Sequence, residues 1–159
     1  MVRGKSVFSK IDRTRAYNQI PVAEGDVPRT AITTPFGLFE FPYMSFGLRN
    51  AAQTFQWFID EVLRDFDFSF AYIDLILIAS TTTEEHKKHL RILFKRLKEY
   101  GVVINPSKSI FDLTQIEFLG YRITQQETAP LPEKVQIIVN FPQPTTAKAL
   151  QQYLGMFNF

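Results

Sequence analysis

Residues 68–80 have the sequence FSFAYIDLILIAS, in which two apolar runs are separated by Ile73 and Asp74. Both runs are rich in aromatic and β-branched residues, a composition typical of buried strands. A carboxylate is rarely buried without a partner, so Asp74 is best placed at a bend and not inside a strand. The stretch therefore predicts a buried β-hairpin with an acid at its tight turn.

Upstream of this hairpin, the sequence predicts further extended segments. Residues 6–12 (SVFSKID) are expected to form a short strand that ends in an acid, Asp12. Residues 30–34 and 38–44 are strand candidates on either side of a turn signal, the sequence PFG at 35–37.

Two helices are predicted to flank the hairpin. Apolar residues follow helical spacing from Ala51 to Phe66, which indicates an amphipathic helix. Thr82 and Glu85 have the spacing of a capping box, and Gly101 lies where a C-terminal cap is expected, so a second helix is placed between them. The Lys and Arg residues of this second helix are interpreted as a solvated surface.

The last third of the chain is predicted to contain short extended segments followed by two helices. The extended segments are expected at residues 102–104, 109–112 and 116–123. After residue 125 prolines become frequent, with a short helix expected at 133–140 and a last helix capped by Thr145 or Thr146. Antiparallel strand pairs with helices packed on one face define the predicted fold class, α+β.

Composition narrows the classes of protein to consider. The chain has 159 residues, of which 45% are hydrophobic, enough for a core. It contains no cysteine, so neither a disulfide nor a thiolate metal site can form. No stretch approaches the roughly 20 apolar residues that span a bilayer, so no membrane partner is expected. The net charge of +2 does not by itself identify a nucleic-acid-binding protein.

The two acids beside apolar strands, Asp12 and Asp74, have the clearest chemical meaning. Two converging carboxylates could hold hard divalent cations such as Mg²⁺. A pair of such ions stabilises the attacking hydroxyl and the leaving pyrophosphate of a nucleotidyl transfer. Their separation in sequence specifies no site, however, and on spacing alone turn capping or salt bridges explain the two acids better.

Five short motifs occur in order along the chain. They are FSKID with AYNQI within residues 8–20, AITTPFGLFEF with MSFGLRNAAQTFQ within 31–56, FAYIDLIL at 70–77, GVVINPSK at 101–108 and EFLGY at 117–121. They resemble motifs A to D and the primer grip of gypsy-type LTR retrotransposon reverse transcriptases, and residues 132–135 and 141–159 resemble the start of the thumb. The resemblance implies a polymerase palm at residues 1–126, followed by the start of the thumb or connection at 127–159.

The same resemblance implies an activity and its partners. The family carries out RNA-directed DNA polymerisation, in which two metal ions, Mg²⁺ or alternatively Mn²⁺, support the addition of deoxynucleotides to a primer. The implied partners are an RNA or DNA primer–template, a deoxynucleoside triphosphate and the remainder of the Pol polyprotein, including fingers, thumb and RNase H. The implied location is intracellular, either cytoplasmic or within a particle.

Roles for individual residues are also implied by the resemblance. The catalytic and metal-binding residues would be Asp12 and Asp74. The nucleotide pocket would be formed by Tyr17, Phe46, Gly47 and Lys108, with Tyr17 as the steric gate against a 2′-hydroxyl. The primer would be held by Tyr72, Ile73, Leu119, Gly120 and Tyr121. The plainer alternatives are that Tyr17 and Phe46 are core aromatics and that Gly120 serves a tight strand crossing.

Several positions depart from the pattern of the family. Leu75 occupies the second aspartate of its Tyr-x-Asp-Asp motif, and leucine has no oxygen to offer a cation. Arg13 follows the motif A acid where an apolar residue is usual, Ser45 replaces a proline, and Ser109 stands where cysteine is common. We therefore expect catalysis by this copy to be impaired. The alternative is a catalytically inactive retroelement remnant that retains only nucleic-acid or protein binding.

Overall fold

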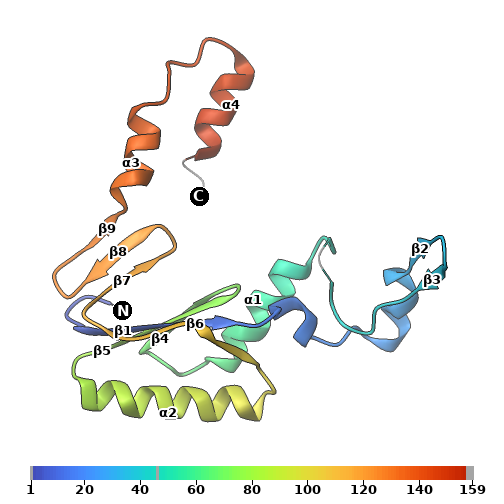
Figure 1. Cartoon of the computed structure of the whole chain (residues 1–159), viewed down its shortest axis with the longest axis horizontal. Coiled ribbons are helices and arrows are strands. Elements are labelled where there is room, and N and C mark those ends of the chain that lie inside the picture. Colours follow the sequence, from blue (N-terminus) through green and yellow to red (C-terminus); the bar gives the residue numbers. More distant parts are fainter. Residues whose placement is uncertain (1, 46, 157–159) are drawn as a thin grey trace.

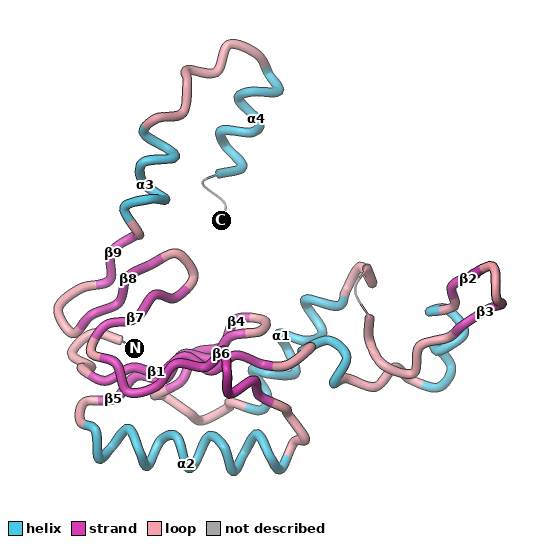
Figure 2. Tube along the Cα trace, viewed as in Figure 1, coloured by secondary structure: helices cyan, strands magenta, loops and turns pink. Residues whose placement is uncertain are grey.

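The computed structural model describes residues 2–45 and 47–156, and at its centre lies a four-stranded antiparallel sheet (Figures 1 and 2). The strands are β1 (Val7–Arg13), β4 (Ser69–Tyr72), β5 (Leu75–Ser80) and β6 (Ile104–Leu113), in the order β4-β5-β1-β6. The predicted strand ending near Asp12 and the predicted hairpin around Asp74 are both confirmed, and they are neighbours in the sheet.

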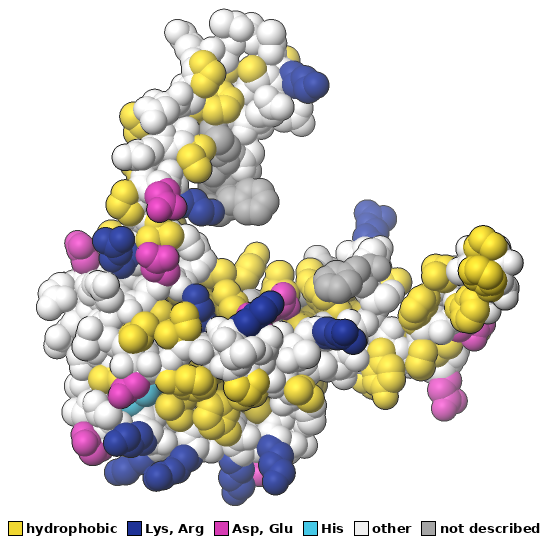
Figure 3. Space-filling model, viewed as in Figure 1, with side chains coloured by type: hydrophobic (Ala, Val, Ile, Leu, Met, Phe, Trp, Pro, Cys, Tyr) yellow, Lys and Arg dark blue, Asp and Glu magenta, His cyan; other side chains and the backbone are white. Residues whose placement is uncertain are grey.

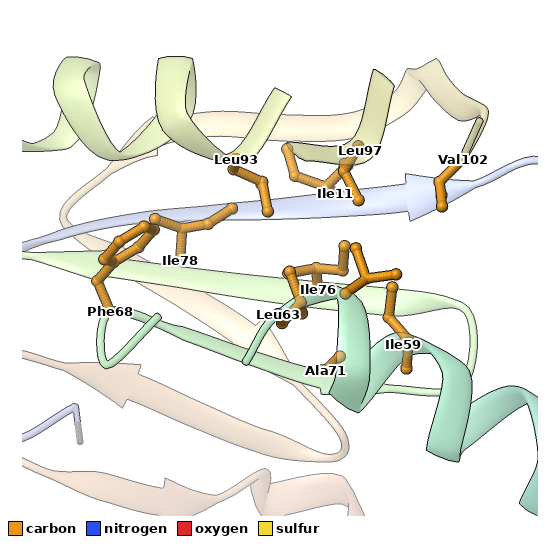
Figure 4. Close-up of a cluster of buried hydrophobic side chains, with 11 residues drawn as sticks. Ile11, Ile59, Leu63, Phe68, Ala71, Ile76, Ile78, Leu93, Leu97 and Val102 are labelled. Carbon is orange, nitrogen blue, oxygen red and sulfur yellow. The ribbon is translucent and has the colours of Figure 1, made fainter. Parts of the chain in front are cut away.

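Two helices cover one face of this sheet. They are α1 (Ala51–Val62) and α2 (Thr83–Glu99). Side chains alternate across a strand, so Ile11, Ile76 and Ile78 all point toward the helices. They pack there against residues of α1 and α2 that include Ile59, Val62, Leu93 and Leu97, and most of this cluster is drawn in Figure 4. Helices on a single face of an antiparallel sheet confirm the predicted α+β class.

The opposite face of the sheet is partly covered by a second, three-stranded sheet. Its strands are β7 (Gln115–Phe118), β8 (Tyr121–Thr124) and β9 (Thr128–Pro130), paired in that order. Phe8 and Leu77 of the central sheet pack here against Ile116, Phe118 and Ile123. The two middle strands, β1 and β5, are therefore largely buried on both faces, which explains why β5 reads as a continuous apolar run.

The ends of α2 follow the capping pattern expected from the sequence. The Thr82 side chain accepts a hydrogen bond from the Glu85 backbone N–H at 3.2 Å, and the Glu85 carboxylate accepts one from the Thr81 N–H at 2.6 Å. At the other end Gly101 has φ +70°, and the Val102 N–H donates to the Leu97 carbonyl at 2.8 Å. This is a Schellman-type cap, which requires a left-handed residue and so favours glycine.

Two arms extend away from the central sheet (Figure 1). One contains the 3₁₀ helices η1 (Ala16–Gln19) and η2 (Glu24–Thr30) and a small hairpin of β2 (Ile32–Thr34) and β3 (Gly37–Phe39). The other contains α3 (Pro132–Val139) and α4 (Ala147–Met156). Apolar side chains gather on the surface of the β2–β3 arm, whereas Lys and Arg gather along the outer side of α2 (Figure 3). Within residues 2–45 and 47–156, no helix has the length and apolar character to cross a membrane.

Some predicted boundaries are wrong. The segment 116–123 is not one strand but the hairpin β7–β8, because Leu119 and Gly120 both adopt positive φ and turn the chain. The segments near 104 and 109–112 belong to one continuous strand, β6, whose register against β1 shifts twice. The strand expected at 38–44 ends at Phe39, and the helix expected to reach Phe66 ends at Val62.

Candidate active site

The bend of the β4–β5 hairpin consists of Ile73 and Asp74, since Tyr72 and Leu75 on either side of them are paired. Ile73 has φ +44°, a left-handed conformation that strains a β-branched residue. Gln56 of α1 holds this bend in place. Its side-chain oxygen accepts a hydrogen bond from the Ile73 N–H at 2.9 Å, and its amide nitrogen donates to the Ala71 carbonyl at 3.1 Å.

Asp12 and Asp74 are brought to the same end of the central sheet. In the register between β1 and β5, Asp12 lies directly opposite Leu75, the residue that follows Asp74. The Arg13 backbone N–H also donates a hydrogen bond to the Asp74 carbonyl at 3.1 Å, which ties the bend to the end of β1. The two acids that were far apart in sequence therefore belong to one site.

Leu75 lies at the position where a third carboxylate would complete this site. Because it is the cross-strand partner of Asp12, the two side chains lie on the same face of the sheet. The Leu75 side chain is half-buried and packs against the apolar cluster that includes Phe8 and Leu77. The leucine packs at the edge of the apolar cluster that involves β7 and β8, so this end of the sheet has an apolar side chain where the motif resemblance led us to expect a metal ligand.

Arg13 points to the other face of β1 and is almost completely buried, with 3% of its surface exposed. Its guanidinium lies over the Phe55 ring of α1, 4.7 Å from the ring centroid. None of its three side-chain nitrogens has a hydrogen-bond partner among residues 2–45 and 47–156. Burial lowers the pKa of Arg13 to about 10, against the opposing effect of Asp74, Asp12 and Asp60. The side chain is therefore still a cation at neutral pH.

The pKa of Asp74 is raised above its ordinary value. Partial burial of the carboxyl is the main cause, although the residue as a whole is exposed, and the nearby Asp12 acts in the same direction. The Arg13 cation opposes this rise. The carboxyl thus experiences both the negative Asp12 and the positive Arg13 at short range.

Tyr17 lies in η1 beside the same site. Its ring meets Phe55 edge to face with centroids 5.6 Å apart, and it packs with the cluster that contains Met44. Burial raises the pKa of the Tyr17 hydroxyl, and the negative Asp74 and the hydroxyl of Tyr72 contribute further. Tyr17 is therefore partly a core aromatic and also experiences the charge of Asp74, while its role as a steric gate stays a prediction.

The other predicted nucleotide-binding residues are less well connected to the acids. Gly47 has φ +94° and precedes α1, while Phe46 lies outside the described residues. Lys108 is exposed on β6. Its neighbour Ser109 is closer to the chemistry, because its hydroxyl accepts a hydrogen bond from the Asp12 N–H at 3.0 Å and donates to the Asn105 carbonyl at 2.8 Å.

Of the predicted primer-binding residues, Tyr72 and Ile73 lie at the β4–β5 bend, whereas Leu119, Gly120 and Tyr121 lie at the turn of the β7–β8 hairpin. Leu119 and Gly120 have φ +50° and +80°, and Tyr121 pairs with Phe118 across the turn. A Cβ at Gly120 would lie only 3.1 Å from the Lys134 side chain, so this glycine also permits a close approach. Phe118 contacts Phe70 of β4 edge to face at 5.9 Å, which connects this hairpin to the strand that precedes the bend.

Gln56 and Ser109 are the positioning residues that sequence reasoning did not assign. Gln56 is the last residue of the second motif and Ser109 directly follows the fourth, but the hydrogen bonds that give them a positioning role are made with backbone groups of other elements. A polar residue on the inner side of an otherwise apolar helix was the available signal for Gln56. Its role depends on which strand the helix covers, and periodicity does not encode that.

The donor set does not fit a pair of divalent cations. Two carboxylates and one leucine stand at the end of the sheet, with a guanidinium behind them that has no hydrogen-bond partner in the described part of the chain. Within the described part of the chain, no group of three or more His, Cys, Asp or Glu side chains could hold a metal ion. Hard cations need several oxygen ligands, so the residues present could retain one ion at most, and weakly.

Comparison with known proteins gives one consistent result. The family model described as reverse transcriptase (RNA-dependent DNA polymerase) matches residues 2–123. The chain is 38% identical to a retrovirus-related Pol polyprotein from the transposon opus of Drosophila melanogaster, over 96% of this chain and 15% of that protein. It is 34% identical to the transposon Tf2-3 polyprotein of Schizosaccharomyces pombe, over 99% of this chain and 12% of that protein. The chain thus spans less than a sixth of these curated relatives.

Comparison with solved structures also points to reverse transcriptases. A foamy viral protease-reverse transcriptase in complex with RNA/DNA hybrid superposes with a TM-score of 0.81 and 28% identity, covering 99% of this chain and 22% of that one. A second foamy viral protease-reverse transcriptase, in complex with double-stranded DNA, gives a TM-score of 0.87 at 28% identity, over 99% of this chain and 28% of that one.

Proposed function

Because this chain belongs to the reverse transcriptase (RNA-dependent DNA polymerase) family, we propose that it is a polymerase palm that positions a primer–template and a deoxynucleotide but performs the transfer step poorly. The observation that carries this proposal is the direct pairing of Asp12 with Leu75 in the central sheet. A carboxylate at that place would face Asp12 across the strands. The leucine instead presents an apolar side chain that packs against the cluster of Phe8 and Leu77.

The residue roles in this proposal follow the order of the motifs. Asp12 and Asp74 would be the remaining cation ligands, and Tyr17 would contact the sugar of the nucleotide. The primer would lie along the bend and the β7–β8 turn, against Tyr72, Ile73, Leu119, Gly120 and Tyr121. The contact between Phe70 and Phe118 supports this, because it brings those two turns into one surface. Phe46, Gly47 and Lys108 stay as proposed nucleotide contacts on the motif resemblance alone.

Reverse transcriptases generally use divalent metal ions, and Mg²⁺ or Mn²⁺ remains the proposed cofactor here. Nucleotidyl transfer benefits from an ion on the attacking oxygen and another on the leaving oxygen. Since the donor set supports one weak site at most, we assign no catalytic step to this chain's own metal binding. What its residues do is hold the bend, the sugar-contacting tyrosine and the primer surface in a fixed relation.

The proposed partners are a primer–template, a deoxynucleoside triphosphate and the rest of a Pol polyprotein. Two solved relatives are complexes with RNA/DNA hybrid or double-stranded DNA, and the curated relatives are polyproteins several times longer than this chain. An intracellular, particle-associated location belongs to the same proposal, because the relatives are retrotransposon products. The division into a palm at 1–126 and the start of the thumb at 127–159 is also retained as a proposal.

Primer extension on an RNA template with Mg²⁺ tests the proposal. This chain and its Leu75→Asp variant would each be joined to the fingers and thumb of a related active enzyme. We expect the variant to extend the primer at least about 100-fold faster, since a catalytic group commonly contributes several kcal/mol. Leu75→Asn serves as a control, because it is polar and similar in size but brings no charge. Equal rates for the native chain and Leu75→Asp would show that Asp12 and Asp74 suffice, and would refute the impairment.

A binding-only remnant is the second candidate, favoured by the buried Arg13 and by Leu75 together. Such a remnant would bind a primer–template with an affinity that falls as salt rises, because phosphate contacts release counterions. A titration of labelled RNA/DNA hybrid at several salt concentrations measures this. Binding without extension, even in the Leu75→Asp variant, would favour the remnant.

A further inference from the structure

Arg13 is the most anomalous buried group in the described part of the chain. An arginine is rarely buried without a partner, and an unpaired buried charge is expensive. Among residues 2–45 and 47–156 its three side-chain nitrogens find no hydrogen-bond partner, and its guanidinium lies over the face of Phe55. A cation–π contact of this kind compensates only part of the lost hydration. The remaining compensation has to come from nearby negative charge.

That negative charge is the candidate active site itself. The carboxylates that act on the guanidinium are Asp74 at the hairpin bend, Asp12 beside it on β1 and Asp60 on α1. The backbone adds a direct link, since the Arg13 N–H donates to the Asp74 carbonyl. The Gln56 side chain donates to the Asp60 carboxylate at 2.8 Å, so Asp60 is engaged elsewhere. Asp74 and Asp12 are therefore the main counter-charges of the buried cation.

We propose that the Arg13 guanidinium is a built-in counter-cation of the Asp12–Asp74 pair, and that it weakens the binding of divalent cations there independently of Leu75. This inference rests on the proposed function, because it takes the acid pair as the metal-binding end of the palm. The reason is electrostatic: a divalent ion is held by the negative potential of the carboxylates, and a fixed positive charge behind them reduces that potential.

The proposal has a consequence for repair of the site. Two departures lower the negative charge at the same place, the loss of a carboxylate at Leu75 and the presence of a cation at Arg13. Restoring the acid alone leaves the guanidinium in position, and although Arg13 and Leu75 lie on opposite faces of the sheet, the positive charge would still offset part of the restored negative potential. The double change Leu75→Asp with Arg13→Met is therefore expected to bind cations more tightly than either single change.

Manganese binding by the chain itself is the test. Electron paramagnetic resonance reports free Mn²⁺ directly, so a titration at slightly alkaline pH gives the affinity without any catalytic assay. Arg13→Met keeps an unbranched chain over Phe55 but removes the charge, and we expect it to bind Mn²⁺ at least about tenfold more tightly, the scale on which a nearby opposite charge alters a carboxylate. Adding Asp74→Asn to Arg13→Met should abolish the gain, which would locate the ion at the acid pair.

Arg96→Met is a matched control. Arg96 also lies over a phenylalanine, Phe66, with its guanidinium carbon 4.7 Å from the ring centroid, but it lies on α2 and donates a hydrogen bond to the Val62 carbonyl. It removes the same net charge from the chain and should leave Mn²⁺ binding unchanged. Circular dichroism checks that each variant is folded. If Arg13→Met does not fold, Arg13→Leu provides a second uncharged variant.

Each outcome decides between the two proposals. If Arg13→Met and Arg13→Leu bind Mn²⁺ no more tightly than the native chain, or if Arg96→Met gains as much, Arg13 is not a counter-cation of the site. If in that case Leu75→Asp still gains affinity, the proposed function stands and only this inference fails. If the native chain already binds Mn²⁺ as tightly as Leu75→Asp, the proposed impairment fails, whereas a gain in Arg13→Met would still support the counter-cation.

Discussion

Ser9 and Arg13 lie on the same face of β1, two residues before and two residues after Ile11. Their polar groups differ in how many hydrogen bonds they make. At the Ser9 end, its hydroxyl is 2.6 Å from the His86 Nε2 atom and accepts a hydrogen bond from the Asp112 N–H at 3.1 Å. At the Arg13 end, the described residues offer the guanidinium no hydrogen-bond partner. Both groups are buried, so exposure does not explain the difference.

The Ser9 end is a continuous polar network. The Ser80 hydroxyl lies 2.8 Å from Nδ1 of His86 and 2.8 Å from Nδ1 of His89, so the chain of contacts runs from β1 through β5 to α2. Each of these bonds can be made with both imidazoles neutral, since every hydroxyl can donate once and accept once. Buried polar groups that serve the fold are satisfied in this way.

The comparison teaches where this protein tolerates an unsatisfied group. The satisfied cluster lies beneath α2, three residues along β1 from Asp12, and it joins β1, β5, β6 and α2. The unsatisfied cation lies where the sheet ends at the acid pair and where Ile73 is also strained. Strain and unpaired polar groups concentrate at sites shaped for function, and they persist only when surrounding packing holds them.

Breaking the satisfied end should have the largest effect on stability. His86→Ala removes one hydrogen-bond partner from each of the buried Ser9 and Ser80 hydroxyls and also creates a cavity. We expect a loss of about 3 kcal/mol in the free energy of unfolding, measured by urea denaturation. Lys87→Ala, on the exposed side of the same helix, should change the unfolding free energy little. A comparable loss in both variants would mean that helix propensity, and not the network, accounts for the effect.

Removing the unpaired charge of Arg13 should instead raise the free energy of unfolding. Arg13→Met replaces a buried unpaired cation with an apolar side chain of similar length, and we expect a gain of about 2 kcal/mol in unfolding free energy. Arg96→Met should give no gain, because Arg96 is partly exposed and donates to the Val62 carbonyl at 3.2 Å. Destabilisation by Arg13→Met would show that its contacts with Asp74 and Phe55 outweigh the penalty of burial.

The strained bend offers a smaller test at the same end of the sheet. Gln56→Leu removes both hydrogen bonds to the hairpin and should lower the unfolding free energy by about 1–2 kcal/mol. Hydrogen exchange of the Ile73 amide should accelerate more than that of amides in α2, because the lost contact is local. Gln53→Leu, exposed on the same helix, is the control. Unchanged exchange at Ile73 would show that the bend is held without Gln56.

Lowering the pH should have the smallest and most gradual effect on stability, through the hydrogen-bonded histidines at the Ser9 end. Burial is the main cause of the lowered pKa of both His86 and His89. As the pH falls, the histidines of the unfolded chain therefore bind protons before those of the folded chain. The stabilisation from the neutral histidines is fully present above a pH of about 6.5, and it is lost progressively as the pH falls from there through the lower pKa values of the folded state. We expect a loss of about 1 kcal/mol between neutral pH and about pH 5.5. His86→Gln, which cannot titrate there, should show a shallower decline, and an equal slope would assign the loss to other groups.

Local patterns predicted the elements that matter most for the site. The two apolar runs around Ile73 and Asp74 required a bend, and the strand ending near Asp12 was equally clear from its residues. Capping chemistry placed both ends of α2. The β7–β8 hairpin was missed because its turn contains Leu119. This residue has a positive φ, which the conformational preferences of leucine do not predict.

The sequence by itself determined the family, the order of the motifs, the hairpin with an acid at its bend and the absence of an acid at Leu75. Only the tertiary structure decided that Leu75 faces Asp12, that Gln56 holds the bend and that Arg13 is a buried cation behind the acids. The physical reason is that side-chain period and capping act over a few residues and are visible in one segment. Register and burial depend on which distant segment packs alongside, and a one-residue shift in pairing would turn every side chain to the other face.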